Sequence, residues 1–383
     1  MSRPMRISLI LITVGLISLL AWGSVYHQVR QTTKVEHVVH HRRANAKPAH
    51  KWSTLKLPKT INQQETTTLN QQISDMHFVG SVLIVRGGKI TYERQFGQAN
   101  VARKLPNQAS TAYAIDSIQK IATGALVMQQ IEQHHLSMTD HLKRFFPEVP
   151  HSNEITIRQM LDMTSGLRMD GPVGPTNLQT DDQIVDYDVH HVIFDPALYN
   201  QWQYSQVNYN LLTGVLKKLT GKSYEQLFNQ QVVKRLGLHQ TVMMPSDRLQ
   251  VAVAYAGTPS GDVDYNRAVV TPAAQWHDEV GTGRVATSAR DLYGMISGIM
   301  AGKIISKQAV AQLYQSGSRS TYGGGTYNLY GAAVNHGLGY GYQSMSCVSK
   351  DGKNAVIMLS NSFRSRYSFK PFAEQLYLKL FSN

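Results

Sequence analysis

The sequence predicts an α+β fold in which an antiparallel β-sheet carries an inserted, mainly helical region. Segments rich in β-branched or glycine residues stand near both ends of the folded part, at 80–96 and at 339–360. β-branched residues favour strands. The chain between these segments is predicted as helices and loops up to about residue 245. Strands at both ends with helices between them are typical of an antiparallel sheet with a helical insertion.

Near the N-terminus lies a segment long enough to cross a membrane. Residues 7–26 contain no charged side chain, and twenty such residues span the hydrocarbon core of a bilayer as a helix. Arg3 and Arg6 precede this segment, and positive charges mark the cytoplasmic side. We therefore expect residues 1–6 in the cytoplasm, a single-pass anchor at 7–26, and the rest of the chain outside the cell membrane. A cleaved signal peptide is the alternative, but the apolar run is long and no clear A-x-A site follows it.

Residues 27–60 are basic and rich in histidine, without an apolar period. The first sixty residues hold ten Lys and Arg but one Glu, whereas the other 323 hold 28 basic and 24 acidic residues. We expect 27–60 to be a disordered linker, or a tether that lies along anionic wall polymer or lipid headgroups. The folded part is only mildly basic, which argues against binding to nucleic acid. The single cysteine, Cys347, excludes an intramolecular disulfide.

A folded domain is expected over 61–383. A Gly-Gly pair at 87–88 predicts a hairpin turn between two strands. Ile121, Ala125 and Met128 recur at helical spacing and mark the buried stripe of a helix. The predicted elements are a helix at 69–78, strands at 80–85 and 89–96, a helix at 117–133, strands at 339–348 and 354–360, and a helix from 371 onwards.

Ser117 and Lys120 form an S-x-x-K tetrapeptide at the start of the predicted helix 117–133. Residues three apart share one helical face, so the two side chains are neighbours. A serine hydroxyl is a weak nucleophile without a base, and a partly desolvated lysine can be that base. The tetrapeptide alone is weak evidence, because chance produces one about every few hundred residues. The alternative is an exposed helix with a solvated lysine.

Six segments of the chain, in order, resemble the serine hydrolases related to class C β-lactamases, penicillin-binding proteins and D,D-peptidases. S-x-x-K is the nucleophile signature of these proteins. The resembling segments are 78–100, 115–121, 155–167, 204–214, 281–291 and 335–344. Together they cover roughly 65–380. The resemblance implies the serine β-lactamase and penicillin-binding-protein fold for the domain that follows the anchor.

The same resemblance implies roles for three residues. Ser117 would attack an acyl carbonyl, and Lys120 would be its base. Tyr204 stands at the tyrosine of the second motif, which passes the proton to the leaving group. For Tyr204 the alternative is a packed core aromatic. No metal and no organic cofactor are implied.

Two departures from the family pattern concern substrate binding. Gln206 stands where the family has an asparagine that holds the acyl side of a peptide substrate. His336 heads the third motif, where lysine or histidine faces the substrate carboxylate, and Gly337 follows it. A backbone N–H near Gly339 is expected to be the second oxyanion donor. The alternative for His336 is a loop histidine bonded to the backbone.

These departures favour a D-alanyl ester over a peptide that ends in D-Ala-D-Ala. An ester on teichoic acid has no terminal carboxylate to bind, and its alkoxide leaves more easily than an amine. The pattern resembles the branch with teichoic-acid D-alanyl esterases, so we expect an esterase acting on (lipo)teichoic acid. Asp116, Asp278 and Glu279 are candidates, by sequence position, to contact the ammonium of the D-alanyl group.

Other functions stay open from the sequence. A D,D-carboxypeptidase acting on peptidoglycan stem peptides is the main alternative, and a β-lactamase ranks third. A non-hydrolytic wall-binding protein on the same scaffold is an alternative of a different class. The sequence predicts no oligomeric state.

Overall fold

The computed structural model describes residues 62–170, 178–315, 320–364 and 368–381. The predicted cytoplasmic segment 1–6, the anchor 7–26 and the linker 27–60 lie outside the described residues. Among the residues that are described, no helix has the length and apolar character needed to span a bilayer.

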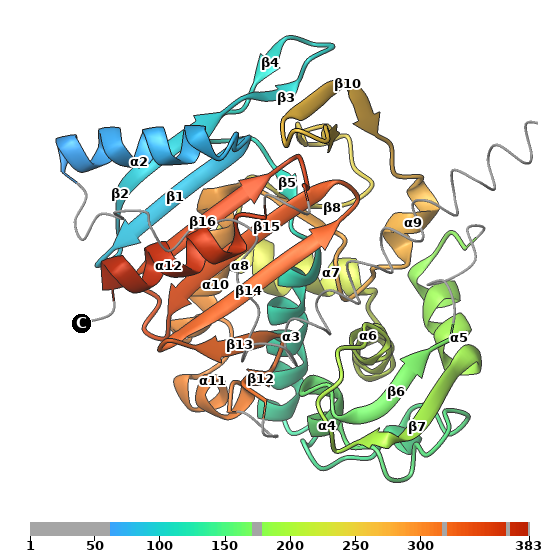
Figure 1. Cartoon of the computed structure of the whole chain (residues 1–383). Helices are drawn as coiled ribbons and strands as arrows, with labels where there is room; N and C mark the ends of the chain where they lie inside the picture. The colour runs from blue at the N-terminus through green and yellow to red at the C-terminus, as the bar shows by residue number, and fades with distance from the viewer. Residues whose placement is uncertain (1–61, 171–177, 316–319, 365–367, 382–383) are drawn as a thin grey trace, which may run out of the picture. The chain divides into compact units, whose positions relative to one another are not determined.

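A seven-stranded antiparallel sheet forms the centre of the described part (Figure 1). Its order is β12-β13-β14-β15-β16-β1-β2, so strands from the two ends of the domain meet in it. Ser81 of β1 pairs with Leu359 of β16, and Val85 with Ala355. The strands are β1 (Gly80–Arg86), β2 (Lys89–Phe96), β12 (Tyr322–Gly323), β13 (Thr326–Leu329), β14 (Ala332–Gly339), β15 (Tyr342–Ser349) and β16 (Ala355–Ser360). The predicted α+β fold with an antiparallel sheet is confirmed.

Helices cover both faces of this sheet (Figure 1). Side chains alternate between the faces of a strand, and β1 follows this rule. Val82 and Ile84 belong to the core beneath α2 (Gln63–Asp75) and α12 (Lys370–Phe381). Leu83 and Val85 belong to the larger core on the other face, where α10 (Ala289–Met300) packs on the sheet and on α3 (Lys120–Glu132).

Elements from the region between β2 and β12 pack around α3. Helix α6 (Val207–Thr220) is buried over most of its length and packs against α3. The other helices are η2 (Asp116–Gln119), η3 (Leu142–Arg144), α4 (Ile157–Leu161), α5 (Asp181–His191), α7 (Tyr224–Phe228), η4 (Asn229–Val233), α8 (Lys234–Leu236), α9 (Ala273–His277) and α11 (Lys307–Leu313). The short strands are β3 (Gln98–Asn100), β4 (Leu105–Pro106), β5 (Tyr113–Ala114), β6 (Ser165–Met169), β7 (Val192–Tyr199), β8 (Thr241–Met243), β9 (Ala254–Gly257), β10 (Val263–Val269) and β11 (Val285–Thr287).

The predicted strand 339–348 is confirmed only from Tyr342 onwards, where it corresponds to β15. The strand expected over 339–348 is divided by a tight turn, so that β14 ends at Gly339 and β15 begins at Tyr342. Tyr340 and Gly341 form this turn with φ values of 49° and 84°. Two positive φ values suit a two-residue hairpin. A tyrosine rarely adopts such a backbone, so the sequence pattern gave no sign of the turn.

Candidate active site

Ser117 lies in the 3₁₀ turn η2, which leads directly into α3. The side chain of Gln119 fixes this turn to the segment 280–285. Its Nε2 donates to the carbonyl of Val280 at 2.9 Å, and its Oε1 accepts from the backbone N–H of Val285 at 2.9 Å. Asp116, immediately before the serine, has a φ of 45°. Such backbone strain persists only where the surroundings enforce it, and it is concentrated at functional sites.

The three side chains that the motifs single out meet at one point. The Oγ of Ser117 lies 2.6 Å from the phenol oxygen of Tyr204 and 3.1 Å from the Nζ of Lys120. The Nζ of Lys120 also lies 5.1 Å from the centre of the Tyr204 ring. The carbonyl of Thr282 accepts a further hydrogen bond from this amine at 3.3 Å. A hydroxyl within hydrogen-bond reach of two proton-accepting groups is the arrangement that nucleophilic catalysis requires.

The three side chains differ in how much solvent can reach them. Lys120 is fully buried, whereas Ser117 and Tyr204 are partly exposed. A substrate can therefore reach the hydroxyl, while the amine contacts only groups of the protein. Removal from water disfavours the charged form of a lysine, which is the condition for it to accept a proton.

The loop before α6 carries Tyr204 into the site. The ring of Tyr204 packs edge-on against Tyr322 of β12, with 6.5 Å between ring centres. Asn208, two residues beyond Gln206, does not take over the missing asparagine. It is buried, its Oδ1 accepts a 2.6 Å hydrogen bond from Ser165, and its Nδ2 donates to the carbonyl of Ser205.

Gln206 is held by the carboxylate of Glu279, a contact that the sequence did not predict. Its Nε2 donates to both oxygens of Glu279, at 2.9 and 3.1 Å. The hydroxyl of Thr282 donates to the same carboxylate. Since a carboxylate can only accept, the Nε2 must face Glu279, and the remaining polar atom of the amide is its Oε1.

Gly337 and Gly339 let strand β14 lie against the nucleophile turn. A side-chain carbon at position 337 would lie 2.0 Å from the carbonyl oxygen of Ile115, and one at 339 would lie 2.7 Å from Oδ1 of Asp116. Real carbon atoms do not approach so closely, so position 337 requires glycine, whereas a side chain at 339 would force the carboxyl of Asp116 to move. Both predicted glycines thus lie beside the turn that carries Ser117, where a strand N–H could reach an oxyanion.

His336 does not join this site, which corrects the sequence-based expectation. Side chains alternate along β14, so His336 points to the face opposite Gly337. There Gln343 lies 3.1 Å from its Nε2, and His336 pairs with Met345 of the core beneath α12. Asn335 lies on the same face of the strand as Gly337 and is buried beside Ser346. A shift of one residue moves a strand side chain to the other face, so an alignment of the third motif that is off by one residue explains the error.

A group of carboxyls interacts electrostatically around Glu279, and one of them, Asp116, directly precedes the nucleophile. Burial first, and the charge of Glu279 second, raise the pKa of Asp116 well above its ordinary value, although Lys120 opposes this. Burial, Glu279 and Asp188 raise the pKa of Asp278 to about 8. Burial also raises the pKa of Asp188 to about 7, against a hydrogen bond from Asn210. Three of these acids were candidates from the sequence, whereas Asp188 was missed because only tertiary contacts bring it here.

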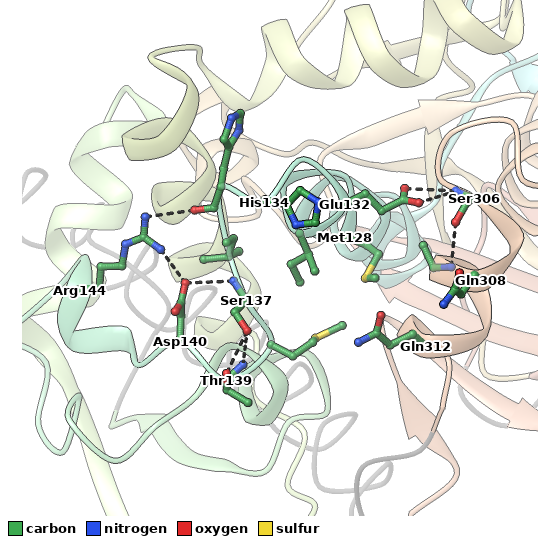
Figure 2. A pocket seen from close by; sticks show the side chains of 15 residues that line it. Met128, Glu132, His134, Ser137, Thr139, Asp140, Arg144, Ser306, Gln308 and Gln312 are labelled. Carbon is green, nitrogen blue, oxygen red and sulfur yellow. Dashed lines mark hydrogen bonds and ion pairs between the residues drawn. The ribbon is translucent and has the colours of Figure 1, made fainter.

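A separate hollow of about 730 Å³ lies at the C-terminal end of α3 (Figure 2). Several of its polar groups bond to one another. Arg144 donates to Asp140 at 2.6 Å, and Glu132 accepts from the backbone N–H of Ser306. None of the predicted site residues lines this hollow.

Comparison with known proteins shows which family and which relatives the chain resembles. A family model described as Beta-lactamase matches residues 70–377. The Bacillus subtilis (strain 168) protein PbpX, which bears the name of a penicillin-binding protein, is 28% identical over 312 residues, 79% of this chain and 76% of that protein. A Staphylococcus aureus teichoic acid D-alanine hydrolase is 26% identical over 211 residues, 54% of this chain and 52% of the relative. The match therefore spans about half of the hydrolase.

Solved structures share the fold. The crystal structure of FmtA from Staphylococcus aureus superposes with a TM-score of 0.72 at 21% identity, covering 90% of this chain and 92% of FmtA. The D-amino acid amidase from Ochrobactrum anthropi SV3 gives a TM-score of 0.69 at 19% identity, covering 82% and 97%. At these identities the likeness shows the fold alone.

Proposed function

The chain belongs to the beta-lactamase family and is a serine hydrolase, and on this premise we propose that it cleaves D-alanyl esters of teichoic or lipoteichoic acid. One observation carries the chemistry: the Oγ of Ser117 lies within hydrogen-bond reach of both Lys120 and Tyr204. A teichoic acid D-alanine hydrolase among the relatives supports the choice of substrate.

The reaction is acyl transfer in two steps. Ser117 gives its proton to the Lys120–Tyr204 pair and attacks the D-alanyl carbonyl, so that a tetrahedral oxyanion forms. Backbone N–H groups of Ser117 and of β14 near Gly339 would hold this oxyanion. The ester bond then breaks, the alkoxide of the polymer takes a proton from Tyr204, and D-alanine remains bonded to Ser117. Water attacks this acyl-enzyme and releases D-alanine.

Two features of the site favour the ester over a D-Ala-D-Ala peptide. The amide N–H groups of Gln206 are directed at Glu279, so they are not directed at a substrate carbonyl. His336 supplies no cation for a terminal carboxylate, because its side chain lies on the other face of β14. A D,D-carboxypeptidase remains the second candidate, since PbpX bears the name of a penicillin-binding protein.

We further propose that residues 7–26 anchor the enzyme in the cell membrane, with 27–60 as a linker and the catalytic domain outside. The support is the uncharged length of 7–26, the two arginines before it and the basic linker after it. In this position the site would face the layer that contains lipoteichoic acid. Protease digestion of intact cells tests the topology, because an external domain is degraded and a cytoplasmic one is protected.

Product analysis tests the substrate. The full-length chain in mild detergent is incubated with D-alanylated lipoteichoic acid and, separately, with a pentapeptide stem, and free D-alanine is measured. We expect release from the polymer by the wild type and none by Ser117→Ala. Release from the peptide alone would contradict the esterase and favour the carboxypeptidase. If neither substrate is cleaved and fluorescent penicillin does not label Ser117, the non-hydrolytic alternative holds.

A further inference from the structure

We propose that Gln206, Glu279 and Asp116 form a subsite for the α-ammonium group of the acyl substrate. The enzyme would then hydrolyse α-aminoacyl esters with a free amine and reject esters whose amine is acylated. This inference rests on the proposed function, since it concerns the acyl group that Ser117 would receive. It adds a selectivity that membership of the family does not provide.

The first support is the reversed polarity of Gln206. At this position, beside Tyr204, an amide that offers N–H groups would suit a substrate carbonyl. In this chain both hydrogen bonds of Nε2 go to Glu279, at 2.9 and 3.1 Å. The amide therefore offers its carbonyl oxygen, and Glu279 adds a partly exposed carboxylate behind it. Both groups accept hydrogen bonds, which suits a substrate that donates them.

The second support is Asp116. It directly precedes the nucleophile, only 4% of its surface is exposed, and its Oδ2 has no hydrogen-bond partner among the described residues. A buried carboxyl oxygen without a partner is costly. A ligand that donates a hydrogen bond and carries positive charge would remove this cost.

Two glycines let the backbone pass close to Asp116 and Glu279. A side-chain carbon at Gly283 would lie 2.9 Å from Oε2 of Glu279 and 3.2 Å from Cα of Asp116. One at Gly339 would lie 2.7 Å from Oδ1 of Asp116. The backbone thus passes close to both acids without a side chain between them. Burial and, second, the charge of Glu279 raise the pKa of Asp116, and a cation bound beside the two acids would offset this repulsion.

The same geometry disfavours N-acylated substrates. An N-acyl group replaces the ammonium with a neutral amide, whose carbonyl would face the acceptor atoms of Gln206 and Glu279. Polar groups left unpaired in a site reduce the rate strongly. The penultimate D-alanine of a stem peptide is N-acylated in this way, whereas D-alanine esterified to teichoic acid has a free amine. The subsite would therefore accept the D-alanyl ester of teichoic acid and reject the stem peptide.

Two esters of one alcohol test the inference, the D-alanyl ester and the N-acetyl-D-alanyl ester. The full-length enzyme in mild detergent is assayed on each, and the ratio of the two kcat/KM values is the readout. We expect a ratio of at least about tenfold in favour of the free amine. Glu279→Gln keeps the size of the side chain and should reduce this ratio at least about tenfold. Glu148→Gln, at an exposed acid, is the matched control and should leave the ratio unchanged.

Asp116→Asn provides the second measurement if Glu279→Gln does not fold, as judged by thermal melting. A wild-type ratio near one, or an equal loss on both esters in each folded variant, would overturn the subsite. Failure of the proposed function has a different signature. A high ratio on the small esters without D-alanine release from lipoteichoic acid would refute the polymer substrate and retain the subsite.

Discussion

The phenol oxygen of Tyr204 lies 2.6 Å from the Oγ of Ser117, while the ring of Tyr204 is held edge-on by Tyr322. The hydroxyl and the ring can therefore be tested separately. Tyr204→Phe keeps the ring and removes only the proton-transferring group. We expect kcat on a D-alanyl ester to fall about 100- to 10,000-fold, the range typical of general acid–base catalysis.

The thermal midpoint is the control for this variant. Since the aromatic contact with Tyr322 is kept, we expect the midpoint to change by at most a few degrees. Steady-state kinetics that give a wild-type kcat for Tyr204→Phe would mean that Tyr204 is a packed aromatic and nothing more.

Lys120 combines full burial with a position 3.1 Å from the nucleophile. Lys120→Met retains the length of the side chain and removes the amine. We expect the rate of acylation of Ser117 to fall at least about 100-fold, because the serine loses its base. Pre-steady-state kinetics with a chromogenic D-alanyl ester measure this rate.

We expect Lys120→Met to lose activity without losing stability. A buried amine is costly, and an apolar side chain of similar size is often neutral or stabilising in its place. We therefore expect the free energy of unfolding of Lys120→Met to equal or exceed that of the wild type. Lys143→Met, at an exposed lysine, is the control. Loss of the fold in Lys120→Met would show that the amine is structural.

Gly337 tests whether contact between β14 and the nucleophile turn matters. A methyl group there would lie 2.0 Å from the carbonyl oxygen of Ile115. Gly337→Ala should therefore move the strand, destabilise the fold by about 1–3 kcal/mol and reduce kcat as the oxyanion donors shift. Urea denaturation and ester kinetics measure the two effects.

Gly294→Ala is the matched control for this prediction. Gly294 lies inside α10, and its nearest neighbour would be the flexible end of Leu238 at 3.3 Å. Alanine favours a helix more than glycine does, so we expect little loss of stability and full activity. Equal effects of the two substitutions would contradict a special role for position 337.

Local spacing was enough to predict that the side chains of Ser117 and Lys120 are neighbours, whereas their catalytic roles rested on the order of the other motifs. Ser117 and Lys120 are one helical turn apart, so any helix at 117–133 places them together. Tyr204 could be named only because its motif follows in the expected order. The contact of Gln206 with Glu279 joins distant parts of the chain and has no local signal. The position of the His336 side chain could not be predicted, because a shift in strand register by one residue moves a side chain to the other face of the sheet.

The buried carboxyls predict how stability depends on pH. The pKa of Asp278 is about 8 and that of Asp188 about 7 in the folded protein, against an ordinary value near 3.8. Between about pH 4 and pH 8 the folded state therefore holds protons that the unfolded state has lost. The stabilisation that these two protonated carboxyls provide is complete below about pH 4. It decreases steadily as the pH rises, and it is lost once the pH has passed through the folded-state pKa values of about 7 and 8. We expect the free energy of unfolding to fall as the pH increases over this range.

Asp278→Asn removes one of these titrating groups. We expect the decline in the free energy of unfolding between pH 5 and pH 7 to become shallower by up to about 1.4 kcal/mol per pH unit. Urea denaturation at a series of pH values measures the slope. Asp351→Asn is the control, because hydrogen bonds from Ser349 and Lys353 lower the pKa of this exposed acid, and its titration lies below the range. An unchanged slope in Asp278→Asn would mean that Asp278 is already ionised in the folded protein. The charge beside Glu279 would then be present at every pH tested.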